Sequence, residues 1–184
     1  MKKVINKITF STVLKAMPII IIWALFFIVP QNEVFEYSVN PNNGLKSIFT
    51  GVLFHANYSH IINNTILLMI LLPVLSRYRR GKKYYTFLLF AYLIPSIAIY
   101  IGDVPTIGIS GLVYALFSYC TIKLCLEGDS ETYVLILLSF WGFGMISGLF
   151  PIEPHVSWIG HSSGFALGAL WGIFGDRIET KRIK

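Results

Sequence analysis

Six long runs of apolar residues, separated by short polar or Gly/Pro-rich stretches, dominate the chain. A helix that crosses a bilayer needs about 20 mostly apolar residues at about 1.5 Å rise each. Because the bilayer core holds no water for exposed peptide groups, such segments satisfy their backbone as helices. We therefore predict an all-α membrane protein with spans at about Phe10–Pro30, Ala56–Ser76, Tyr84–Ile101, Ile109–Leu126, Thr132–Phe150 and Trp158–Phe174.

The composition supports this interpretation. Of 184 residues, 55% are hydrophobic and 13% are charged, about half the ~25% charged residues of typical soluble domains. This balance excludes a disordered chain and disfavours a water-soluble globule. We predict one polytopic membrane domain over residues 1–184. The two cysteines, Cys120 and Cys125, are too few for a disulfide framework and lack the spacing of zinc ligands.

The distribution of positive charge predicts the orientation. Lysines precede the first apolar run, but no cleavage site of small residues follows it, so we expect a retained helix rather than a signal peptide. With the N-terminus in the cytoplasm and six spans, every basic residue except Lys46 falls on the cytoplasmic side. The positive-inside rule therefore predicts that both termini are cytoplasmic. The basic stretch at residues 77–83 is interpreted as a short cytoplasmic loop at the lipid surface, not as a nucleic-acid site.

Unusual polar residues gather where the second, fourth and sixth segments begin, which is the outer leaflet in this orientation. Ser110 opens the fourth segment within the pattern G-x-S-G, and His161 opens the sixth. A serine is a poor nucleophile without a base, and a neutral imidazole can take its proton. No Asp or Glu lies in the same outer stretches, so the residues suggest a catalytic Ser-His pair rather than a triad. Taken singly, the serine could be a packing residue and the histidine a cross-helix hydrogen bond.

Small residues make the pairing geometrically plausible. One stripe recurs along the sixth segment at three- and four-residue steps, and a second follows Ser110; they comprise Gly164, Gly168, Gly172 and Gly175, and Gly111, Ala115 and Ser118. Small faces let helix backbones approach closely in lipid. Such packing, which is also the plain structural explanation of the stripes, would bring His161 within reach of Ser110.

The second segment offers hydrogen-bond donors. His60 and Asn64 are four residues apart and share a helix face. With the Ser110 backbone N–H they could donate to an oxyanion, although an interhelical bond is an equal explanation for Asn64. We interpret His55 as structural, with a contact to the loop that follows the first span. Tyr114 could pack under His161 or simply fill space. His155 is interpreted as a loop residue.

Together these residues closely resemble the rhomboid intramembrane serine proteases. The resemblance covers all six segments and is carried by three motifs: H-x4-H-x3-N at His55, His60 and Asn64; G-x-S-G followed by a tyrosine at Gly108, Ser110, Gly111 and Tyr114; and G-H-x2-G-x3-G at Gly160, His161, Gly164 and Gly168. It implies a six-helix rhomboid-like bundle in which Ser110 is the nucleophile and His161 the general base. It also implies an oxyanion hole of His60, Asn64 and the Ser110 amide.

The resemblance further implies hydrolysis of transmembrane helices in other proteins, near their outer ends and at small residues. Such an enzyme needs no metal or cofactor, and its partners are transmembrane substrates and membrane lipids. We expect the minimal six-helix form, without a seventh span or an appended cytosolic domain, in a prokaryotic plasma membrane with the site opening outward. The loop between the first two segments has about 25 residues and contains neither Trp nor Arg, unlike many rhomboids, so its conformation is open.

We hypothesise that Phe140, Trp141 and Phe143 line a lateral entrance for substrate and that residues 148–157 cap the site. Two alternatives to a protease remain. A catalytically silent rhomboid-like protein would bind or chaperone membrane clients with the same fold, and Ser110→Ala would leave that activity intact. A small transporter would continue its polar path through the bilayer, whereas here the polar residues stop in the outer half and no internal repeat is apparent.

Overall fold

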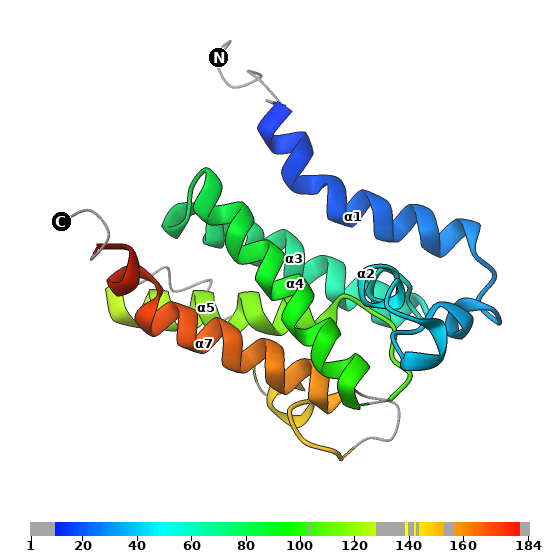
Figure 1. Ribbon diagram of the computed structural model, residues 1–184. Coiled ribbons are helices and arrows are strands. Elements are labelled where there is room, and N and C mark those ends of the chain that lie inside the picture. Colours follow the sequence, from blue (N-terminus) through cyan, green and yellow to red (C-terminus); the bar gives the residue numbers. More distant parts are fainter. Residues whose placement is uncertain are drawn as a thin grey trace, which may run out of the picture.

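The chain folds into a bundle of long helices (Figure 1). The computed structural model describes residues 10–102, 104–127, 139, 142, 144–152 and 157–180, and their side chains except at 10–16 and 176–180. The long helices are α1 (Phe10–Ile28), α3 (Tyr58–Tyr78), α4 (Lys82–Gly102), α5 (Ser110–Glu127) and α7 (Trp158–Thr180). In Figure 1, α3, α5 and α7 begin toward the right and run left, whereas α1 and α4 run the opposite way. The helical class predicted from the sequence is confirmed for the described residues.

Local signals explain where α3 begins and where the chain turns from α3 into α4. Asn57 caps α3, since its side-chain oxygen accepts the backbone N–H of His60 at 2.9 Å. Arg79 leaves the helix in an extended conformation, and Gly81 takes a positive φ of 56° before α4 begins. The predicted segments are therefore shifted: α3 starts two residues later than expected, and α4 includes Lys82 and Lys83.

The prediction of a basic loop over residues 77–83 is wrong in detail. Arg77 belongs to α3, the two lysines belong to α4, and the connection is only residues 79–81. Arg79 is 1% exposed. Its Nε donates to the Tyr119 hydroxyl at 3.0 Å, and its guanidinium lies within about 6 Å of three ring centroids, those of Phe87, Tyr119 and Trp171. Packing against aromatic rings explains why this arginine is buried while its neighbours in the motif are not.

Helix α5 forms the centre of the bundle. Every residue from Gly111 to Cys120 is buried, and the helix contacts α3, α4 and α7. A helix without a polar face must be covered on all sides, by protein or by lipid. The residue that opens α5 is Ser110, so the central helix of the fold presents this serine at one end.

The packing of α5 against α7 is a backbone-to-backbone contact. A Cβ placed on Gly168 would overlap the Ala115 carbonyl oxygen and the Ser118 hydroxyl. That hydroxyl donates to the Phe165 carbonyl oxygen at 2.8 Å across the interface. Small residues therefore let the two helices approach more closely than side chains would permit.

The connection from α1 to α3 is compact, which settles the conformation that the sequence left open. It contains short helical turns: η1 (Val34–Tyr37), η2 (Pro41–Asn43), α2 (Ser47–Thr50) and η3 (Gly51–Leu53). Val39 and Thr106 exchange backbone hydrogen bonds of 2.8 and 3.4 Å, and the Tyr92 hydroxyl of α4 donates to the Phe49 carbonyl. The connection thus holds the strand-like segment that leads into Ser110.

Two of the described helices, α3 and α4, have the length and hydropathy of membrane spans, and shorter apolar stretches occur at Met17–Ile28 and Ser110–Leu126. Residues 139, 142 and 144–147 of the predicted fifth segment are helical. The count of six spans stays a prediction.

We predict that Gly168→Ala destabilises the bundle, because the new methyl group would meet backbone that cannot yield. Overpacking of this kind typically costs about 1–3 kcal/mol. The measurement is the apparent melting temperature in detergent. Gly144→Ala is the matched control, since a Cβ there has nothing within 4 Å. Equal melting temperatures for the two variants would contradict the proposed close contact.

Candidate active site

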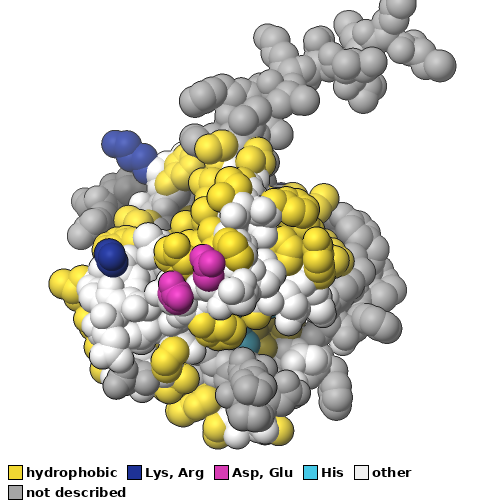
Figure 2. Space-filling view, turned by 90° about the vertical axis from the view of Figure 1, so that its right-hand side faces the viewer, with side chains coloured by type: hydrophobic (Ala, Val, Ile, Leu, Met, Phe, Trp, Pro, Cys, Tyr) yellow, Lys and Arg dark blue, Asp and Glu magenta, His cyan; other side chains and the backbone are white. Residues whose placement is uncertain are grey.

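The first residues of α5 and α7 meet at one end of the bundle. Ser110 is the first residue of α5, and His161 lies in the first turn of α7. Ser110 Oγ is 2.8 Å from His161 Nε2. Ser110 is half-buried and His161 is 9% exposed. Figure 2 views this end of the molecule and shows a histidine side chain recessed between other side chains. The structure therefore brings together the two residues that the sequence proposed as a pair.

Glycines at the crossing point permit this approach. A Cβ on Gly164 would overlap the carbonyl oxygen of Gly111, and a Cβ on Gly111 would lie 3.3 Å from the Gly160 carbonyl oxygen. Gly111 directly follows Ser110, and Gly164 lies one turn after His161. The stripe that the sequence suggested is therefore the surface that sets the distance between the two side chains.

The His161 ring is held on two further sides. The Tyr114 ring stacks on it, with centroids 4.1 Å apart and an angle of 11° between planes. Its Nδ1 lies 3.0 Å from the Gly148 carbonyl oxygen. A carbonyl can only accept a hydrogen bond, so we assign the proton of the neutral ring to Nδ1. The lone pair of Nε2 then faces the Ser110 hydroxyl, which is the arrangement that a general base requires.

His60 packs against the turn that precedes the serine. Gly108 has φ of 109°, a conformation that favours glycine. A Cβ at this position would also lie 2.6 Å from His60 Nε2. Both the backbone conformation and the space therefore require glycine at the first position of G-x-S-G, and its absence of a side chain lets His60 approach the start of α5.

Asn64 is buried and engaged with His55. Its amide nitrogen lies 3.0 Å from His55 Nε2, and His55 Nδ1 lies 3.3 Å from the Leu53 carbonyl oxygen. Since the Leu53 carbonyl accepts, His55 carries its proton on Nδ1 and accepts from Asn64 at Nε2. His55 thus fixes which way the Asn64 amide points. The contact of His55 with the first loop was expected; its bond to Asn64 was not.

Burial keeps His55 neutral. Desolvation is the main effect that lowers the pKa of His55 from 6.5 to about 3, the nearby His60 ring adds to it, and the bond to the Leu53 carbonyl opposes it. The two imidazole rings meet edge to face, with centroids 4.9 Å apart. A neutral His55 is the form that can accept the Asn64 hydrogen bond.

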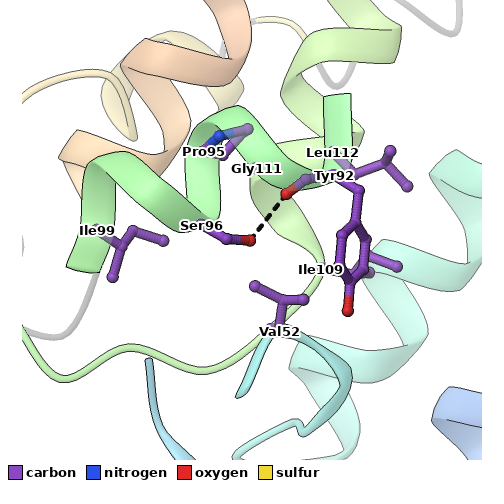
Figure 3. A pocket seen from close by; sticks show the side chains of 9 residues that line it. Val52, Tyr92, Pro95, Ser96, Ile99, Ile109, Gly111 and Leu112 are labelled. Atoms are coloured by element: carbon purple, nitrogen blue, oxygen red, sulfur yellow. Dashed lines mark hydrogen bonds between the residues drawn. The ribbon is translucent and has the colours of Figure 1, made fainter. Parts of the chain in front are cut away.

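A small pocket adjoins the backbone on either side of Ser110 (Figure 3). The Ser96 hydroxyl at its wall donates to the Tyr92 carbonyl oxygen at 2.8 Å. The remaining wall is mostly apolar and comes from η3, α4, the turn before α5 and the start of α5: Val52, Pro95, Ile99, Gly108, Ile109, Gly111 and Leu112. This lining places no charged side chain beside the serine turn.

Some predicted residues lie outside the described part of the chain, and some contacts were missed. His155 and the aromatic residues Phe140, Trp141 and Phe143 are outside it, so the lateral entrance stays a hypothesis. Ser162, for which the sequence pattern indicates no role, donates its hydroxyl to the Leu149 carbonyl oxygen at 2.7 Å. Within the described residues, no cluster of three or more His, Cys, Asp or Glu side chains could hold a metal ion.

Comparison with known proteins identifies the class. The Rhomboid domain model matches residues 42–177, which covers the helices that carry the site, and the chain belongs to the rhomboid family. Members of this family are embedded in membranes. Similar proteins include uncharacterized proteins from Mycobacterium bovis and Mycobacterium tuberculosis. Each is 29% identical in an alignment of 140 positions that covers 70% of this chain and 58% of the relative. The chain thus spans less than two thirds of the length of these relatives.

We predict that acid destabilises the protein in part through His55. Its pKa in the unfolded chain is near 6.5, whereas in the folded protein it is about 3. The unfolded state therefore binds more protons between these values, and stability falls as pH drops below about 6.5. The apparent melting temperature in detergent should fall less between pH 7.5 and pH 5 in His55→Gln, which keeps an acceptor but does not titrate. An equal fall in melting temperature in the wild type and His55→Gln would show that His55 does not cause the acid sensitivity.

Proposed function

We propose that this protein is an intramembrane serine endopeptidase that hydrolyses transmembrane helices of other proteins with a Ser110–His161 dyad. The observation that carries the proposal is the 2.8 Å contact between Ser110 Oγ and His161 Nε2, with Nδ1 bonded to a carbonyl. Family membership supports it, because rhomboid proteins are typically intramembrane serine proteases. We also propose six spans with both termini in the cytoplasm of a prokaryotic cell and a site open to the outer side.

The dyad geometry supplies the first chemical step. Ser110 Oγ attacks the scissile carbonyl carbon while its proton passes to His161 Nε2, which gives a tetrahedral oxyanion and an imidazolium. His161 then returns the proton to the departing amine, and the peptide bond breaks to leave an acyl-serine. Water, deprotonated by the same ring, hydrolyses the ester and restores the serine.

Three groups are our candidates for donors to the oxyanion. A helix leaves the N–H groups of its first residues without intrahelical acceptors, and Ser110 is the first residue of α5. His60 lies against the preceding turn. Asn64 has a second amide hydrogen besides the one it gives to His55. We propose these three groups as the oxyanion hole, in which one donor can contribute about 3 kcal/mol to the transition state.

A membrane location fits the chemistry of this site. Hydrocarbon supplies neither water nor donors for peptide hydrolysis, so the polar groups must be gathered at the end of a bundle that excludes lipid. A substrate helix has to unwind before its peptide bond can reach the serine. Small and helix-weakening residues lower the cost of unwinding, which supports transmembrane helices with such residues as the substrate class.

We predict that Ser110→Ala and His161→Ala each lower cleavage of a fluorogenic transmembrane substrate in liposomes by at least about 10³-fold. Ser110→Ala should also abolish labelling by a fluorophosphonate probe. Ser163→Ala is the matched control, because the Ser163 hydroxyl bonds back to Ile159 within α7.

Three results would count against the proposal. Undiminished cleavage by Ser110→Ala would mean that another nucleophile, or a contaminant, is responsible. Folded wild-type protein that neither cleaves nor labels would favour the catalytically silent alternative. A loss of cleavage in Ser163→Ala as large as in His161→Ala would indicate that substitutions in α7 damage the protein generally, and would remove the support for a catalytic dyad.

A further inference from the structure

The turn that ends the fifth hydrophobic segment is bonded to the residues that surround the dyad. Residues 144–147 are helical and 148–149 form a turn. The Tyr114 hydroxyl of α5 donates to the Met145 carbonyl oxygen at 2.9 Å. His161 of α7 donates from Nδ1 to the Gly148 carbonyl oxygen at 3.0 Å.

A third bond comes from the residue next to His161. The Ser162 hydroxyl donates to the Leu149 carbonyl oxygen at 2.7 Å. The last carbonyls of a helix have no intrahelical donors, so side chains of the candidate site supply donors for this helix end. The end of the segment and the ring of His161 are therefore held by one set of hydrogen bonds.

Gly148 is the residue that allows this contact. A Cβ on it would overlap the Tyr114 hydroxyl and would lie 3.0 Å from His161 Nδ1. By contrast, a Cβ on Gly144, one turn earlier, has nothing within 4 Å. The two glycines of the same helix end thus differ in whether they can accept a methyl group.

We propose that residues 145–149 form a latch on the dyad, in which Gly148 is a positioning residue whose carbonyl holds His161 in its reactive orientation. This inference rests on the proposed protease function. The carbonyl fixes the ring proton on Nδ1 and so keeps the Nε2 lone pair toward Ser110, the task that a carboxylate performs in a Ser-His-Asp triad. Because the carbonyl belongs to neither α5 nor α7, the alignment of the dyad depends on where the end of the fifth segment sits.

The latch makes reactivity sensitive to the position of one segment. When residues 145–149 are seated, His161 has a stacking partner, an acceptor for Nδ1 and the serine at Nε2. When they move away, the ring loses its Nδ1 acceptor, and Tyr114 loses the bond that orients its hydroxyl. A displaced latch therefore lowers the rate of chemistry without removing either member of the dyad.

The test compares Gly148→Ala with Gly144→Ala in full-length protein in liposomes. For Gly148→Ala we expect kcat on a fluorogenic transmembrane substrate, and the rate of fluorophosphonate labelling, to fall at least 10-fold while KM changes less than twofold. Gly144→Ala should match the wild type in all three. The chain has four histidines, so ¹⁵N-histidine NMR can resolve His161, and its Nδ1–H tautomer should dominate in the wild type and diminish in Gly148→Ala.

If Gly148→Ala does not fold, variants that remove a single hydrogen bond test the latch instead. Tyr114→Phe keeps the ring that stacks on His161 but removes the bond to Met145. Ser162→Ala removes the bond to Leu149, and Ser162→Thr keeps a hydroxyl. We expect each loss of a bond to lower kcat at least threefold and Ser162→Thr to retain most of the activity.

Distinct outcomes separate this inference from the proposed function. Wild-type protein that is folded but neither cleaves nor labels would overturn the protease proposal and the latch with it. An active wild type with unchanged kcat, labelling and His161 tautomer in Gly148→Ala would overturn the latch alone. If Gly148→Ala fails to fold, wild-type activity in both Tyr114→Phe and Ser162→Ala would also overturn it.

Discussion

The contact between the backbones of α5 and α7 is the constraint on which the rest of this structure depends. A Cβ on Gly164 would overlap the Gly111 carbonyl oxygen and one on Gly168 would overlap the Ala115 carbonyl oxygen, so α5 leaves no room for a side chain at either glycine of α7. In lipid, where apolar burial gives helices little reason to associate, such contacts and the hydrogen bonds they permit supply the attraction. Because Ser110 and His161 stand at the start of these helices, the same contact sets their separation. Stability and the geometry of the Ser110–His161 pair thus have one physical origin.

Backbone carbonyls take the place of carboxylates around this site. The Gly148 carbonyl faces His161 Nδ1 and the Leu53 carbonyl faces His55 Nδ1, so each ring is oriented by a neutral group. A buried charge at membrane depth is expensive, and an uncompensated carboxylate would carry that cost at all times. A carbonyl fixes the tautomer at lower cost, although it stabilises an imidazolium less than a carboxylate would. His161 therefore depends on the backbone at the end of the fifth hydrophobic segment, and His55 on the turn just before it in the chain.

Contacts could be predicted from the sequence where all the residues involved lie on one face of a helix. The apolar runs, the glycine stripe and the four-residue spacings indicated helices whose small faces meet near Ser110 and His161, and the structure has them in contact. The environment of a side chain could not be predicted where its contacts come from other helices rather than from its neighbours in sequence. Arg79 looked like part of an exposed basic cluster, yet rings from α4, α5 and α7 bury it. Asn64 bonds to His55 and Ser162 to Leu149, and helical periodicity predicts neither bond because each partner lies outside the helix that carries the first residue.

The sequence by itself indicated the class of protein, the described helices and the pairing of Ser110 with His161, because apolar length, helical periodicity and residue type are local properties. Only the tertiary structure decided the tautomers of His55 and His161, the conformation of residues 29–57, and the closeness of Gly148 to His161. The His161 tautomer depends on the Gly148 carbonyl of another segment, and the His55 tautomer on the Leu53 carbonyl in the turn just before it. Every residue has a carbonyl, so the sequence does not indicate which carbonyl will orient a ring. Gly148 is the exception, because its lack of a side chain is what lets its carbonyl approach His161.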